Sequence, residues 1–383
     1  MKDYVTVPED LIKITKYEVI DKLPNPFVFN DGTPVKTKKD WEKRRKEILD
    51  CTVELQYGKM PPEPEFLEVV PSYRTHRGFQ SYNIKTGTKE KPIFLSMHVI
   101  VPKGTGPFPT VISGDMCFDT HYDRDWIASF RDKGIMLVLF DRTDLAPDDA
   151  AFFKKGQIFE SFPDYDGKAI AVWAWGYSRC LDAIERTGLA DMNCITFTGL
   201  SRGGKAAMLA GVMDERATIV NPNATCAGGC SCYRLNIKAI TEDNEEKSSE
   251  TITITNRFPH WFNPELKNYI NKEADLPFDS HYLKALVAPR FYVQTEAGSD
   301  IWANPVGAWQ TTMAATEVYK FLDAEDHIFW HYRNGYHDQT VRDTDMLVNV
   351  ILHIYKGEKL DDAFFHTPFK KPELMFDWRC NKK

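Results

Sequence analysis

The segment from Thr198 to Ala207 carries the residue types best suited to nucleophilic chemistry. It contains the pattern Gly-x-Ser-x-Gly as Gly199, Ser201 and Gly203, after a run typical of a strand and before a run typical of a helix. A sharp turn in that position exposes the serine hydroxyl and directs backbone N–H groups of the helix N-terminus at a developing oxyanion. The pattern also arises by chance in glycine-bearing turns, but its position between a strand and a helix favours a catalytic serine. We therefore predict that Ser201 is a nucleophile.

A serine nucleophile needs a base, and His337 is the histidine best placed to act as one. In folds with this serine turn, the histidine follows the serine in the chain and lies in a loop near the C-terminus. His337 lies in the loop Asn-Gly-Tyr-His-Asp, after a predicted strand at 327–332 and before a predicted helix at 340–355. This placement predicts that His337 is the general base.

The acid of such a triad orients the imidazole, and the loop after the strand predicted at 290–294 offers two carboxylates, Glu296 and Asp300. Spacing alone does not decide between them. Asp300 precedes an aromatic residue and a rigid Asn-Pro step, which favours it as the acid. Glu296 is then expected to cap the strand end or to face solvent.

The elements that must position these residues alternate along the chain. Strands are predicted over 93–101, 109–113, 134–140, 194–198, 217–220, 290–294 and 327–332, and helices over 168–186, 306–322 and 340–355. Such alternation predicts a mostly parallel central sheet with helices on both faces. Combined with the serine turn, it predicts an α/β-hydrolase three-layer sandwich.

The first 65 or so residues are more charged and hold one predicted helix, 39–57, which Gly58 and the prolines after it end. The basic run Arg44-Arg45-Lys46 on this helix is expected to be a solvated face. No repeat or sharp boundary divides the rest. We predict a single catalytic domain over 1–383 with an N-terminal extension over about 1–65.

Composition excludes several classes of function. The 383 residues include 48 Lys and Arg against 55 Asp and Glu, a formal net charge of −7, which argues against a nucleic-acid partner. No apolar run approaches the roughly 18 residues that cross a membrane, so no membrane partner is expected. Charges near the N-terminus leave no signal peptide. This predicts a cytoplasmic protein as the sequence is written, and a secreted one if the sequence is a trimmed mature form.

Three of the eight cysteines, Cys226, Cys230 and Cys232, lie close together in the sequence, as metal ligands often do. They lack a paired Cys-x-x-Cys and a nearby histidine, so a zinc site is disfavoured. We expect free thiols in a turn of small residues, in a reducing compartment. No metal and no organic cofactor is expected.

The run GLSRGGK at 199–205 resembles the G-x-S-R-x-G-K signature of glucuronoyl esterases. These carbohydrate esterases cleave ester links between glucuronic acid on xylan and lignin alcohols. The resemblance spans roughly 44–355. Five further stretches resemble the same family: AVWAWG at 171–176, FPHWF at 258–262, LPFDSH at 276–281, ALVAPR at 285–290 and DIWANP at 300–305. The last of these is similar to the acid loop of the family's bacterial branch.

The resemblance implies roles that spacing does not show. Arg202 would add its guanidinium to the oxyanion hole, and Lys205 would hydrogen-bond sugar hydroxyls. Trp302 would contact the glucuronate, and Glu250 and Trp261 would help to line the same pocket. Without the resemblance, Lys205 would be interpreted as a surface lysine and Arg202 as a salt-bridge residue.

Two features depart from the fungal pattern. Fungal members place the acid soon after the strand that follows the serine turn, whereas the loop at 221–227 has no carboxylate, which supports Asp300 as the acid. Fungal members also have a cysteine directly before the serine, where this chain has Leu200, so their disulfide is absent. Family members are usually exported.

These observations predict a serine esterase that hydrolyses esters of glucuronic or 4-O-methylglucuronic acid, as in lignin–carbohydrate links of glucuronoxylan, through an acyl-enzyme. The expected partner is a carbohydrate, glucuronoxylan or its fragments. One alternative is an acetyl xylan esterase or another short-chain carbohydrate esterase that uses the same residues. A second is a binding module that has kept the fold and lost turnover.

Overall fold

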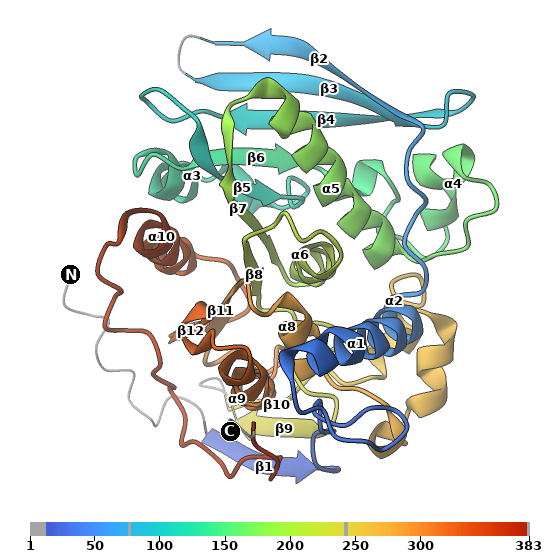
Figure 1. The fold of residues 1–383 in the computed structure, drawn as a ribbon, viewed down its shortest axis with the longest axis vertical. Coiled ribbons are helices and arrows are strands. Elements are labelled where there is room, and N and C mark those ends of the chain that lie inside the picture. Colours follow the sequence, from blue (N-terminus) through green and yellow to red (C-terminus); the bar gives the residue numbers. More distant parts are fainter. Residues whose placement is uncertain (1–12, 76–77, 241–243, 381–383) are drawn as a thin grey trace.

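The computed structural model describes residues 13–75, 78–240 and 244–380. A nine-stranded sheet with the order β12-β11-β8-β7-β5-β6-β4-β3-β2 runs through the molecule (Figure 1). Neighbouring strands from β12 to β6 are parallel, and β4, β3 and β2 continue the sheet in antiparallel fashion. The strands are β2 Phe66–Arg74, β3 Phe79–Gly87, β4 Pro92–Ile100, β5 Phe108–Ser113, β6 Met136–Phe140, β7 Ala190–Leu200, β8 Ile219–Asn223, β11 Phe291–Ala297 and β12 Ile328–Arg333.

Helices cover both faces of this sheet, because its strands are apolar on both sides. In β6, Val138 packs into the core beneath α5, α6, α8 and α9, whereas its neighbour Leu137 packs into the core beneath α3 and α10. The α/β-hydrolase sandwich predicted from the sequence is therefore confirmed. The helices are α3 Arg124–Arg131, α4 Gln157–Ser161, α5 Ala169–Thr187, α6 Arg202–Met213, α7 Ile254–Arg257, α8 His281–Val287, α9 Pro305–Phe321 and α10 Val341–Lys356.

The N-terminal helix predicted at 39–57 is also confirmed. It consists of α1 Lys38–Leu49, a π-helical turn at Asp50–Glu54 and α2 Leu55–Tyr57. Gly58 ends it with a φ of 76°, a left-handed conformation that favours glycine.

The prediction that the basic run Arg44-Arg45-Lys46 forms a solvated face is wrong for Arg44. Its guanidinium is buried and donates to the backbone oxygen of Pro26 and to the hydroxyl of Tyr282 on α8. A buried guanidinium with several acceptors ties α1 to the body of the molecule. Lys46 alone in the run is well exposed, in an ion pair with Asp50.

A second, three-stranded antiparallel sheet was not predicted. It consists of β1 Lys13–Val19, β9 Leu235–Ile240 and β10 Glu246–Ser248, in the order β1-β9-β10. The signal-peptide prediction concerns mainly residues 1–12, which lie outside the described residues. None of the helices in the described part of the chain is long and apolar enough to span a membrane.

Candidate active site

The serine turn is strained in the manner its motif predicts. Ser201 lies between β7 and α6 with φ 56° and ψ −120°, a conformation that costs a non-glycine residue on the order of 1–3 kcal/mol. Its N–H donates to the backbone oxygen of Asn223 at 2.9 Å, which anchors the turn to β8. The strain holds the serine hydroxyl at the carboxyl edge of the parallel strands, where α/β folds place their ligands.

A buried ion pair lies beneath this turn. Asp115 follows β5 and accepts a hydrogen bond from the N–H of Leu200 at 2.7 Å, while Arg142, which follows β6, donates to its other oxygen. A Cβ at Gly203 would overlap the Asp115 carboxylate, so the turn requires glycine there. Sequence analysis missed this pair, although charged residues directly after two buried strands were a signal for it.

His337 and Asp300 come together at the same edge of the sheet. His337 lies in the loop between β12 and α10, and its Nδ1 is 2.7 Å from Oδ2 of Asp300. Asp300 is buried and follows β11, and the imidazole is partly exposed. An ionised carboxylate can only accept, so Nδ1 carries the proton and the Nε2 lone pair is left to take one.

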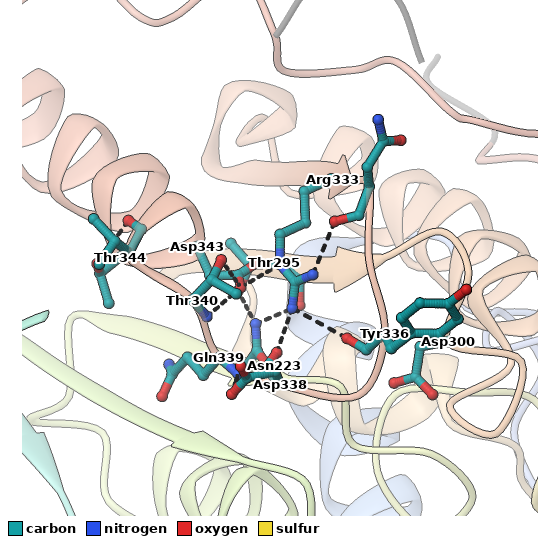
Figure 2. A network of polar contacts seen from close by, with 12 residues as sticks. Asn223, Thr295, Asp300, Arg333, Tyr336, Asp338, Gln339, Thr340, Asp343 and Thr344 are labelled. Carbon is teal, nitrogen blue, oxygen red and sulfur yellow. Dashed lines mark hydrogen bonds and ion pairs between the residues drawn. The ribbon is translucent and has the colours of Figure 1, made fainter. Parts of the chain in front are cut away.

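A second network shapes the histidine loop (Figure 2). The guanidinium of Arg333, at the end of β12, donates to the backbone oxygens of Asn334, Tyr336 and Asp338, which flank His337. Its Nε donates to the buried carboxylate of Asp343 at 2.6 Å, in the first turn of α10. One buried cation thus fixes the backbone on both sides of His337.

The structure corrects the expectation for Glu296, which neither caps a strand end nor faces solvent. It lies within β11, is buried, and neither of its carboxylate oxygens has a hydrogen-bond partner among the described residues. Burial, and then the nearby charge of Asp300, raise the pKa of Glu296 well above its usual range. The raised pKa favours the neutral form of Glu296, whose oxygens lack the kind of hydrogen bond that Asp300 makes to His337.

Arg202 begins α6 directly after the serine. Its Nη1 donates to Oδ2 of Asp148 at 2.7 Å, and its guanidinium lies over the ring of Trp261 at 4.8 Å. Trp261 is 2% exposed and donates its Nε1–H to Oδ1 of Asp148 at 2.7 Å. Trp261 therefore lies behind the arginine. No local signal pointed to Asp148, because it reaches Arg202 only through the fold.

Lys205 is buried rather than on the surface, one helical turn after the serine. Its Nζ donates to Oε1 of Glu250 at 3.0 Å, and both side chains are nearly inaccessible. Burial raises the pKa of Glu250, and the charge of Lys205 opposes that rise. The N–H of Glu250 donates to the backbone oxygen of Trp302, whose indole is 38% exposed. The structure thus brings these three predicted residues together.

The cysteine cluster shows no sign of a metal centre. Cys226, Cys230 and Cys232 are free and buried; the thiol of Cys232 donates to Asp279, and that of Cys230 contacts the hydroxyl of Tyr292. Burial raises the pKa of all three thiols. Over the described ranges no group of three or more metal-ligating side chains could hold an ion.

The sheet order, the strained serine turn and the histidine at the carboxyl edge define the class of this protein as an α/β-hydrolase. The family model described as "Glucuronyl esterase, fungi" matches residues 84–323, more than half of the chain. The chain therefore belongs to the glucuronoyl esterase family, which confirms the resemblance. Its expected place in the bacterial branch stays a prediction.

Curated relatives agree with this family. The chain is 33% identical over 312 residues to 4-O-methyl-glucuronoyl methylesterase 1 of Phanerochaete chrysosporium, which covers 80% of this chain and 63% of the relative. It is 30% identical over 315 residues to the enzyme of the same name in Wolfiporia cocos, which covers 80% of this chain and 74% of that one. The chain thus spans less than two thirds of the first relative.

Two solved structures of glucuronoyl esterases are similar to this chain. A carbohydrate esterase family 15 glucuronoyl esterase from Caldicellulosiruptor kristjansonii superposes with a TM-score of 0.82 at 28% identity, over 94% of this chain and 98% of that chain. The glucuronoyl esterase catalytic domain from Hypocrea jecorina, at 24% identity and a TM-score of 0.75, shares the fold over 95% of this chain and 98% of its own.

Proposed function

We propose that this protein is a serine esterase that hydrolyses esters of glucuronic or 4-O-methylglucuronic acid, including the lignin–carbohydrate esters of glucuronoxylan. The observation that carries the proposal is the 2.7 Å hydrogen bond between His337 and the buried Asp300, at the sheet edge where Ser201 is strained. The names of the relatives support the choice of substrate. We further propose a single catalytic domain over residues 1–383, with residues 1 to about 65 as an N-terminal extension.

The reaction then has two halves. In the first, Nε2 of His337 takes the proton of the Ser201 hydroxyl as its oxygen attacks the ester carbonyl, and the resulting imidazolium is stabilised by Asp300. The imidazolium returns the proton to the leaving alcohol. In the second half, His337 deprotonates a water that cleaves the acyl-enzyme and releases glucuronate and the free serine.

The remaining predicted residues bind and polarise the substrate. The guanidinium of Arg202 and backbone N–H groups of the turn stabilise the oxyanion, at typically a few kcal/mol per donor. Lys205 hydrogen-bonds sugar hydroxyls, and its ion-pair partner Glu250 helps to line the same pocket. Trp302 presents its partly exposed indole to the sugar, and Trp261, which lies behind Arg202, helps to line the pocket.

The charge of this site suits an ester. Each of the two cations has a buried or partly buried carboxylate partner, Asp148 for Arg202 and Glu250 for Lys205. An esterified glucuronate carries no charge on its carboxyl group, so the site need not supply a net positive charge to bind it. Polar groups in matched pairs suit its hydroxyls.

Turnover of benzyl and methyl glucuronate, beside acetylated xylan, tests the proposal. We expect wild-type enzyme to prefer the glucuronate esters, and Ser201→Ala to lose about 10⁴- to 10⁶-fold in kcat/KM while it stays folded. Ser129→Ala is the matched control, because that hydroxyl donates to the backbone oxygen of Asp125 within α3. Retained turnover by Ser201→Ala would remove the serine from the mechanism, and a preference for acetyl esters would favour the short-chain alternative.

A further inference from the structure

Asp148 lies in the loop that follows β6, and three side chains from two other segments converge on its carboxylate. Oδ2 accepts from Nη1 of Arg202 at 2.7 Å, and Oδ1 accepts from Nε1 of Trp261 at 2.7 Å and lies 3.0 Å from Nε2 of His260. His260 and Trp261 are buried, so they fix the carboxylate from behind. The arginine is then the only one of the three partners that is partly exposed, at 32%.

Two aromatic rings also contact the guanidinium. The ring of Trp261 stacks on that of Phe258 with centroids 3.9 Å apart and an interplanar angle of 4°. The Arg202 guanidinium lies 4.8 Å from the first ring and 5.3 Å from the second. An arginine that stacks on aromatic faces and is also held at one nitrogen loses most of its rotamer freedom before substrate arrives.

Charge reinforces this arrangement. Burial would raise the pKa of Asp148, but hydrogen bonds from His260, Arg202 and Trp261 outweigh burial and hold its pKa well below the usual range. The carboxylate is therefore negative whenever the enzyme works. It both orients the guanidinium and offsets its positive charge.

We propose that Asp148 is a positioning residue for Arg202, held by His260 and Trp261, and that it is the fixed counter-charge of that arginine. The inference rests on the proposed function, in which Arg202 stabilises the oxyanion. Two consequences follow. The guanidinium is pre-organised for the transition state, and the offset of its positive charge weakens its attraction for the glucuronate anion after hydrolysis.

Asp148→Asn tests both consequences, since it keeps the shape of the side chain and removes its charge. We expect kcat on benzyl glucuronate to fall about 10- to 100-fold, because the guanidinium is no longer held in place, with KM changed less than about threefold. Free glucuronate should bind about two- to fivefold more tightly by calorimetry. The matched control is Asp149→Asn, because the Asp149 carboxylate accepts from the backbone N–H groups of Ala151 and Phe152 in its own loop. We expect this variant to match wild type.

A double-mutant cycle separates positioning from a structural effect. If Asp148 acts through Arg202, Asp148→Asn should cost less than about twofold in kcat/KM when Arg202→Ala is already present. An undiminished loss in that background would overturn the inference. Should Asp148→Asn fail to fold, His260→Phe keeps the ring and removes one support of the carboxylate. His260→Phe should lower kcat/KM by less than Asp148→Asn does, and this loss should disappear when Arg202→Ala is already present. A loss in kcat/KM that adds to that of Arg202→Ala would also overturn the inference.

Different results would contradict the proposed esterase function and the positioning role of Asp148. Absence of turnover by wild-type enzyme sinks the proposed function, and the calorimetric comparison then decides the inference alone. Tighter glucuronate binding by Asp148→Asn supports it, and unchanged or weaker binding overturns it.

Discussion

Two carboxyl groups, Glu296 within β11 and Asp300 just after it, differ in environment. Asp300 hydrogen-bonds the ring, whereas Glu296 is buried without a partner and has a raised pKa. Burial disfavours a charge on Glu296. We therefore expect Asp300, which contacts the ring, to orient the histidine.

This division predicts unequal effects of two isosteric changes. Asp300→Asn should lower kcat about 10³- to 10⁴-fold, because an amide leaves the imidazole without its anionic partner and favours the wrong tautomer. Glu296→Gln should stay within about threefold of wild type, because it replaces one neutral group by another. Rates on methyl glucuronate at neutral pH give the comparison. A larger loss for Glu296→Gln would make Glu296 the acid.

The loop between β12 and α10 depends on one buried arginine. Arg333 donates to three backbone oxygens of the loop and to Asp343 (Figure 2). A Cβ at Gly335, whose φ is 114°, would meet Nη1 of Arg333 at 2.6 Å. The loop therefore folds around the guanidinium, and its hydrogen bonds to Arg333 fix the position of His337.

Arg333→Lys keeps the positive charge near Asp343 but cannot reach the same set of oxygens. We expect kcat to fall about tenfold or more, because His337 loses its fixed backbone, and the free energy of unfolding to fall by about 1–3 kcal/mol for unsatisfied buried groups. Kinetics and urea unfolding measure the two effects. Arg342→Lys, one residue before Asp343, is the control. Equal behaviour of the two variants would contradict this account of the loop.

The elements that the sequence predicted are those with the strongest local patterns. The fully apolar β6 and the amphipathic α5 were predicted to within two residues. The edge strand β2 was missed because it is largely exposed and mixes charged with apolar residues, so neither alternation nor an apolar run marks it. A motif singled out Ser201 and its place in the chain singled out His337 as candidates, but the contact of Asp148 with Arg202 spans 54 residues and leaves no local pattern.

The whole molecule buries several histidines that the mechanism does not use. Burial lowers the pKa of His121 to about 4, of His281 to about 4 and of His331 to about 3. In the unfolded chain each has an ordinary pKa near 6.5. Between these values the unfolded state binds more protons, so stability falls as the pH falls from 6.5 towards 4.

Each such histidine contributes up to about 3 kcal/mol to this loss. Replacing His121, whose Nε2 lies 2.7 Å from the hydroxyl of Ser113, by Gln should reduce the pH dependence of the unfolding free energy by about one proton between pH 4.5 and 6. Denaturant unfolding at a series of pH values measures this. The exposed His366 is the control, and an unchanged slope in His121→Gln would contradict the argument.

The central claim is that Ser201 carries a glucuronoyl group during turnover. Mass spectrometry of enzyme quenched in acid during the first turnover of benzyl glucuronate tests it most directly. We expect an adduct with the mass of a glucuronoyl group on the peptide that contains Ser201, and no such adduct in Ser201→Ala. Rapid hydrolysis with no adduct on that peptide, or with the adduct on another residue, would contradict it.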